Sequence, residues 1–112
     1  MIRARLSLDA DGAIAGFRAS GHADTGPKGV DIVCAAFSVL ARTAYRSLEA
    51  LPGIALRGEA ERPGSLDFSV TRPARERERA AGIAVFFATG LGDLARDYPD
   101  AVAVTIERSS EG

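Results

Sequence analysis

The first residues of the chain alternate between apolar and polar side chains, and this period of two constrains the fold more than any other feature. The apolar positions are Ile2, Ala4, Leu6 and Leu8, and the polar positions are Arg3, Arg5 and Ser7. Such alternation is typical of a strand with one buried face. Asp11-Gly12 predicts a turn, and residues 13–20 alternate again around Ile14, Gly16 and Arg18. The chain is therefore predicted to begin with a hairpin of two strands.

The spacing of apolar residues changes to three and four at Asp31, and this change predicts a helix. Asp31 is expected to cap its N-terminus, and Pro52-Gly53 is expected to end it. The predicted buried stripe consists of Val33, Ala36, Phe37, Leu40, Ala44, Leu48 and Leu51. Residues 23–30 hold two glycines and a proline, so they predict a loop between the strand and the helix.

The second half of the chain repeats the order of a hairpin followed by a helix. Residues 54–61 and 65–71 are predicted strands on either side of an Arg-Pro-Gly turn, and residues 101–107 are a predicted final strand. A second helix is predicted over residues 74–97, with a stripe of Ile83, Phe87, Leu91 and Leu94, and Pro99 ends it. The order ββαββαβ predicts an α+β fold, in which a mixed or antiparallel five-stranded sheet packs against two helices.

Length and composition favour one small cytoplasmic domain that spans residues 1–112. The 14 basic and 15 acidic residues leave a formal charge of -1, so direct nucleic-acid binding is not expected. Cys34 is the only cysteine, which excludes an internal disulfide and favours a reducing compartment. The longest nearly uncharged stretch, 80–91, is far shorter than the roughly 20 residues of a membrane span. The N-terminus lacks the apolar body of a signal peptide, so neither membrane insertion nor secretion is expected.

The single histidine, His22, and the single cysteine lie at the two ends of the predicted loop. If Asp31 caps the helix, Cys34 lies in its first turn, where the helix N-terminus favours a thiolate and the Asp31 carboxylate opposes it. The structural alternatives are a Cys34 buried as a small hydrophobe and a His22 that makes a hydrogen bond within the loop.

Ser38 follows Cys34 by four residues, so the two side chains share a helix face and form a polar strip that can line a site. The alternative is a Ser38 hydroxyl bonded to the Cys34 carbonyl. A metal site is not expected, because His22, Cys34, Asp24 and Asp31 lack the spacing of a ligand set. The glycines match neither a phosphate loop nor a dinucleotide motif, so no cofactor is expected.

The segment from Arg72 to Arg79 mixes four arginines with two glutamates. One interpretation is a solvated beginning of the second helix. The other is a docking patch for an acidic or RNA-rich partner.

The motif Gly21-His22-Ala23, followed after the loop by DIVCAAFSVL over residues 31–40, resembles the bacterial ribosomal-processing cysteine protease family, Prp. The block DIVCAA is the most specific part, the spacing from His22 to Cys34 also fits, and the similarity extends over nearly the whole chain. The resemblance implies a cytoplasmic cysteine endopeptidase that acts as a homodimer. Its implied substrate is a large-subunit ribosomal protein, from which it removes an N-terminal extension during ribosome assembly.

The resemblance also implies roles for individual residues. Cys34 is the expected nucleophile and His22 the general base and later acid, with Gly21, Asp31 and Ser38 as supporting residues around the substrate. A catalytic dyad is expected, because no third member is identified, and backbone N–H groups at the helix start are expected to stabilise the oxyanion. The loop lacks the aromatic residues that members of the family often carry there.

Two rival functions remain at this stage. One is a non-catalytic ribosome- or RNA-associated module that uses residues 72–79 and keeps Cys34 in its core. The other is a thiol hydrolase with a different acyl substrate.

Overall fold

The computed structural model describes residues 1–21, 29–62 and 65–109, and its elements follow the predicted order. The strands are β1 Ile2–Leu8, β2 Ile14–Ser20, β3 Ala55–Arg62, β4 Ser65–Thr71 and β5 Val102–Arg108. The helices are α1 Gly29–Glu49 and α2 Arg77–Asp97, and a 3-10 turn, η1, spans Ala74–Glu76 before α2.

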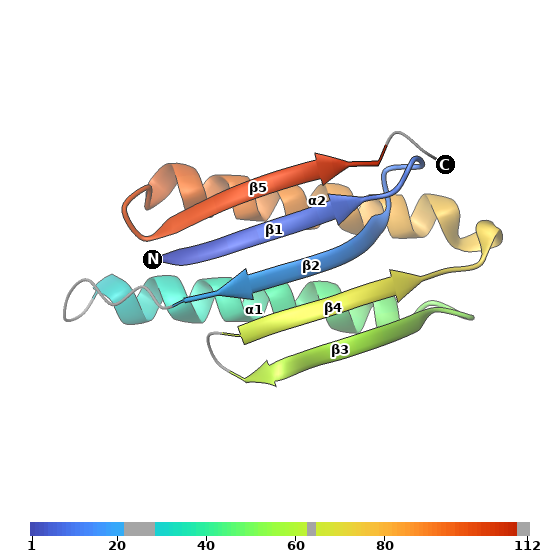
Figure 1. Cartoon of the computed structure of the whole chain (residues 1–112), viewed down its shortest axis with the longest axis horizontal. Coiled ribbons are helices and arrows are strands. Elements are labelled where there is room, and N and C mark those ends of the chain that lie inside the picture. The colour runs from blue at the N-terminus through green and yellow to red at the C-terminus, as the bar shows by residue number, and fades with distance from the viewer. Residues whose placement is uncertain (22–28, 63–64, 110–112) are drawn as a thin grey trace.

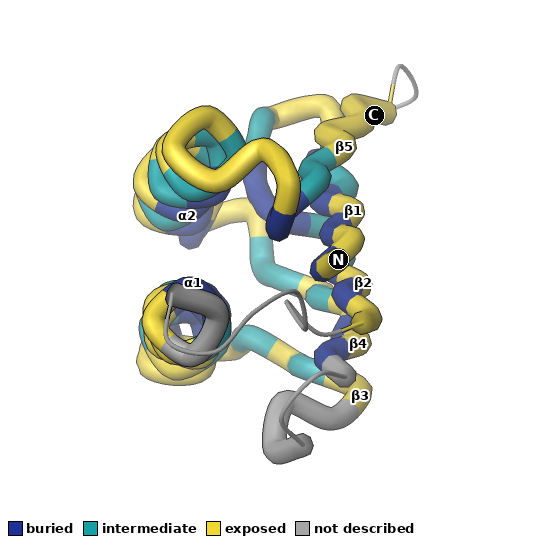
Figure 2. The backbone as a smooth tube through the Cα atoms, turned by 90° about the vertical axis from the view of Figure 1, so that its left-hand side faces the viewer, coloured by how far each residue is buried: buried dark blue, intermediate teal, exposed yellow. Residues whose placement is uncertain are grey.

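The five strands form one sheet in the order β3-β4-β2-β1-β5. β5 runs parallel to β1, with Ile2 opposite Val102, and the other neighbours are antiparallel. The sheet is therefore mixed, and the predicted α+β fold is confirmed (Figure 1). Both helices lie on the same face of the sheet (Figure 2). Neither helix of the described chain has a stretch apolar enough to pass through a bilayer.

The core lies between the inner face of the sheet and the two helices, with Phe17 of β2 near its centre. Its ring centroid lies 4.9 Å from that of Phe87 on α2, 5.8 Å from Phe68 on β4 and 6.2 Å from Phe37 on α1. All four rings are buried. One aromatic cluster thus fixes both helices against the sheet.

The predicted alternation of β2 is wrong in phase. Phe17 and Ala19 are buried and Arg18 is exposed, although Ile14 is buried as well. The cause is a bulge: Ser7 pairs with Gly16 whereas Leu8 pairs with Ile14, so Ala15 has no partner on β1. An extra residue on one strand shifts the inward face by one position.

Two details of the predicted helices also differ. In α1, Ala36 is exposed and Ala41 is buried, because 33, 37, 41, 44 and 48 form the continuous stripe toward the sheet. In α2, Ala80 and Ala84 join Phe87 and Leu91 in the buried stripe, while Ile83 and Leu94 are only half-buried. Small residues let the helix approach the sheet closely.

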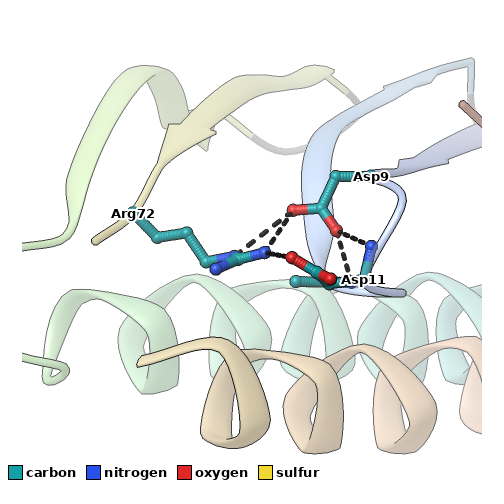
Figure 3. A network of polar contacts seen from close by, with 4 residues as sticks. Asp9, Asp11 and Arg72 are labelled. Carbon is teal, nitrogen blue, oxygen red and sulfur yellow. Dashed lines mark hydrogen bonds and ion pairs between the residues drawn. The ribbon is translucent and has the colours of Figure 1, made fainter. Parts of the chain in front are cut away.

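Arg72 connects the β1–β2 turn to the chain after β4 (Figure 3). Its guanidinium donates to Asp9 Oδ2 at 3.1 and 3.3 Å and to Asp11 Oδ2 at 2.7 Å. Asp9 Oδ1 accepts the backbone N–H groups of Asp11 and Ala13. The Arg72 side chain is only 11% exposed, so the interpretation of residues 72–79 as solvated is wrong at this position.

Glu76 is also buried, and Arg79 Nη2 lies 2.6 and 2.8 Å from its two carboxylate oxygens. Arg75, Arg77 and Glu78 are exposed, as expected for a solvated helix start.

Candidate active site

Gly21 directly follows β2 and has a backbone conformation that favours glycine. Its φ is +92°, and a Cβ atom there would overlap the backbone carbonyl of Met1. The chain leaves the sheet at this point, at the same end of the molecule where α1 begins (Figure 1). His22 and residues 23–28 lie outside the described residues, so the predicted pairing of His22 with Cys34 stays a prediction.

Cys34 lies at the boundary between the buried and exposed faces of α1. Its neighbour Val33 is 2% exposed and its other neighbour, Ala35, is exposed. The thiol is half-buried, free and packed against the core cluster. Cys34 is thus more accessible than the buried hydrophobe of the structural alternative.

Ser38 extends the polar strip by one helical turn, as predicted, and it is half-buried as well. Within the described chain its hydroxyl makes no hydrogen bond, so the alternative bond to the Cys34 carbonyl is absent. Ser38 is therefore half-buried, and its hydroxyl has no partner among the described residues.

Tyr45 shows which strand lies beside the flank of α1 that carries Cys34 and Ser38. It follows Cys34 by about three helical turns and therefore shares its flank. The Tyr45 ring packs edge-on against Phe68 of β4, with centroids 5.3 Å apart. The opposite flank, with Leu40, Thr43 and Ser47, faces α2. The strip of Cys34 and Ser38 consequently faces the β4 side of the molecule. Tyr45 was not predicted from the sequence to lie on this flank, although its helical spacing from Cys34 and Ser38 was a usable signal.

The start of α1 differs from the prediction in a way that matters for the chemistry. The helix begins at Gly29, so Asp31 is its third residue and not its N-cap. Cys34 lies in the second turn, beyond the first four N–H groups that lack an intrahelical acceptor. The backbone N–H of Cys34 is therefore used within the helix, and the field of the helix terminus has weakened there. The Cys34 N–H is therefore not a free oxyanion donor, and the expectation that N–H groups at the helix start stabilise the oxyanion stays a prediction. The Asp31 side chain lies outside the described residues.

Metal-ligand side chains do not gather in the described part of the chain, where no cluster of three His, Cys, Asp or Glu residues is suited to an ion.

The sequence profile of the family described as cysteine protease Prp matches residues 1–103. The chain belongs to the Prp family of cysteine proteases. It is therefore a cysteine protease, which favours the enzyme over the non-catalytic module. No curated protein sequence matches the chain.

Solved structures share the whole fold of this Prp family member. A protein from Streptococcus mutans, SMU.848, is 26% identical, with a TM-score of 0.75, and the alignment covers 97% of this chain and 96% of the other. An essential ribosomal processing protease Prp from S. aureus, in complex with a covalently linked product peptide, is 20% identical with a TM-score of 0.74. That alignment covers 96% of this chain and 100% of the other. The same S. aureus protein in complex with a substrate peptide gives a TM-score of 0.73 at 20% identity and the same coverage.

Proposed function

We propose that this Prp family member is an endopeptidase in which Cys34 is the nucleophile and His22 is the general base. The strongest support is that the sequence contains one cysteine, because a cysteine protease needs a thiol as its nucleophile. That thiol is not in a disulfide, and Cys34 as a residue is half-buried. His22 is the single histidine in the sequence and directly follows Gly21, the residue after β2.

The proposed reaction has two halves. The Cys34 thiol gives its proton to His22, and the sulfur attacks the scissile carbonyl carbon to form a tetrahedral oxyanion. The oxyanion collapses, the C–N bond breaks, and His22 protonates the departing amine. Water, deprotonated by His22, then attacks the thioester carbonyl, and the Cys34 thiol leaves with the proton. The enzyme is thereby regenerated without a cofactor.

The supporting residues are assigned by position. Gly21 lets the chain turn away from β2, and the open hydroxyl of Ser38 is a contact for the peptide next to the nucleophile. Asp31, which lies one helical turn before Cys34 in α1, is proposed as a residue that surrounds the substrate and not as a cap.

The proposed substrate is a large-subunit ribosomal protein with an N-terminal extension. Support comes from the family and from the ribosomal processing function named for the S. aureus relative, which was solved with a substrate peptide. Ribosomal proteins are made in the cytoplasm, so the enzyme is proposed to act there.

The proposed active form is a homodimer joined through the helical layer. Val39, Val85 and Phe86 are 60%, 66% and 69% exposed on the helices. A groove of about 540 Å³ between α1 and α2 is lined mainly by apolar residues, among them Leu40, Ile83 and Phe86. The open face of the sheet is charged instead. Two copies joined through their helices would bury the apolar face and leave both charged faces in water.

The decisive experiment is mass spectrometry of the full-length ribosomal protein after incubation with the wild-type enzyme and with Cys34→Ser. We expect one N-terminal truncation with the wild type and none with the variant, whose circular dichroism stays unchanged. Cleavage by Cys34→Ser would reject the nucleophile. An intact substrate in both reactions would reject the ribosomal protein, and a panel of other acyl substrates would then identify the hydrolase activity.

A further inference from the structure

The face of the sheet opposite the helices is open (Figure 2). This face carries a hollow lined in part by arginines. The hollow has a volume of about 420 Å³ and spans β1, β2 and β5. It is lined by Arg3, Ala4, Arg5, Arg18, Ser20, Ala103 and Thr105. Three guanidinium groups and two hydroxyls thus surround a shallow depression without an aromatic side chain.

The arrangement of the arginines is electrostatically unfavourable when no ligand is bound. Arg5 and Arg18 are directly opposite each other on β1 and β2, and like charges in that position repel. Among the described residues, Arg5 pairs with Glu107 at 3.3 Å and Arg18 pairs with Asp67 at 3.4 Å, and both acids lie on the outer side of the arginine pair. All four of these side chains are at least half exposed. An anion between the two arginines would relieve their repulsion.

Arg3 adds a third positive charge at the end of the hollow nearest the candidate active site. It pairs in register with Ser20, the last residue of β2, which immediately precedes Gly21. In the part of the chain that the structure describes, Arg3 has no ion pair. The positive strip therefore runs along the β1–β2 seam toward the end of the sheet where α1 begins (Figure 1).

The dimensions of the strip fit an extended peptide. Arg3 and Arg5 are two residues apart on one strand, which corresponds to about 6.6–6.8 Å. An extended ligand repeats its side chains at the same interval, so carboxylates two residues apart would face the two guanidinium groups. Glu107 and Asp67 limit the strip on both sides, because they would repel an anion that crossed the sheet.

The same features disfavour a nucleic acid. The lining residues offer no aromatic platform on which a base could stack. The formal charge of -1 provides no overall attraction for a polyanion.

We propose that this hollow recognises an acidic segment of a polypeptide in extended conformation, with two carboxylates separated by one residue. The identification of that polypeptide as the substrate rests on the proposed function. The segment would lie along the β1–β2 seam while the scissile bond reaches Cys34 around the end of the sheet.

Fluorescence anisotropy with labelled Gly/Ser-rich peptides tests the proposal. One peptide contains Asp-Ser-Asp and its control contains Asn-Ser-Asn. We expect the wild type to bind the acidic peptide more tightly, and the double variant Arg3→Gln/Arg5→Gln to lose this preference by roughly three- to tenfold. Arg57→Gln removes an exposed charge from β3, outside the hollow, and should leave the preference unchanged.

Three results would overturn the proposal. They are equal binding of both peptides to the wild type, an unchanged preference in the double variant, and tighter binding of a short oligouridine that displaces the acidic peptide. Because the assay needs no bond cleavage, its outcome is separate from that of the protease experiment. Binding without proteolysis would reject the proposed substrate and keep the acidic-peptide site, whereas proteolysis without binding would reject this site alone.

Discussion

At the scale of single residues, the position of Cys34 on α1 explains how the side chain is held in place and why it can still react. Val33 and Phe37, which are buried, hold this part of α1 against the sheet. Cys34 lies beside them on the flank that faces β4, where it contacts the core and remains partly accessible. A nucleophile on a rigid helix is held in place more firmly than one on a loop.

The reactivity of Cys34 should depend on His22 if the two form a dyad. We expect His22→Ala to slow alkylation of Cys34 by iodoacetamide at neutral pH, because the imidazole no longer accepts the thiol proton. Intact-protein mass spectrometry over time measures the rate. An equal rate in both proteins would mean that His22 has a structural role.

Gly58 permits a backbone approach that no other residue allows. Its φ is +126°, and an added Cβ would lie 2.7 Å from the Phe68 Cα on the neighbouring strand. We expect Gly58→Ala to lower the free energy of unfolding by ~1–3 kcal/mol. The control, Gly92→Ala in α2, has open space around the new methyl group and should raise stability by up to about 1 kcal/mol. Urea unfolding measures both changes, and a neutral Gly58→Ala would contradict the argument.

At the scale of elements, the sequence predicts each strand and helix because its apolar period is local information. The bulge in β2 does not follow from local sequence information, because Ala15 is left without a partner only when β2 pairs with β1. The start of α1 could not be predicted either, because Asp31 resembles a cap although the helix begins at Gly29. Because of this difference, Cys34 was predicted in the first turn of the helix, whereas it lies in the second turn. The polar strip of Cys34 and Ser38 was predictable because a separation of four residues is a property of any helix.

The network around Arg72 joins elements that are distant in the sequence, and its loss should destabilise the fold. Arg72→Gln would leave two carboxylates close together without their cation, at an expected cost of ~1–3 kcal/mol. Arg75→Gln, an exposed change in the same segment, should cost little. Thermal unfolding distinguishes them, and equal unfolding temperatures would show that the network contributes nothing.

The pH dependence of this network follows from the pKa of Arg72, which its hydrogen bond to Asp11 raises above the ordinary value. Because the pKa of Arg72 is higher in the folded protein than in the unfolded chain, the stabilisation is complete at any pH below the pKa of the unfolded chain. It is lost only when the pH rises through the pKa of the folded protein. The effect of Arg72→Gln should therefore not diminish between neutral and moderately alkaline pH.

At the scale of the whole molecule, the two outer surfaces differ in chemistry. The helical layer exposes valine and phenylalanine, whereas the open sheet exposes ion pairs across its strands. This contrast follows from the fold, because a two-layer structure buries only one face of each layer. The sequence alone did not reveal it, since which apolar residues stay outside depends on the packing of both helices.

A dimer through the helical layer should be sensitive to a charge at its centre. We expect Phe86→Asp to convert a dimer into a monomer, because a carboxylate would be buried without a partner. Ser69→Asp places the same charge on the exposed β4 surface and should leave the dimer intact. Light scattering after size-exclusion chromatography measures the mass. A monomeric wild type, or a dimeric Phe86→Asp, would contradict this interface.

The parallel pairing of the first strand with the last has a consequence for how the protein is made. β1 lies inside the sheet only when β5 is present beside it, from Ile2 opposite Val102 to Leu8 opposite Arg108. During translation β1 leaves the ribosome first, and β5 follows only after β2, α1, β3, β4 and α2. Until then the edge of β1 has unpaired backbone groups that could join another nascent chain. The sheet is thus completed only after β5, the last strand in chain order, has been synthesised.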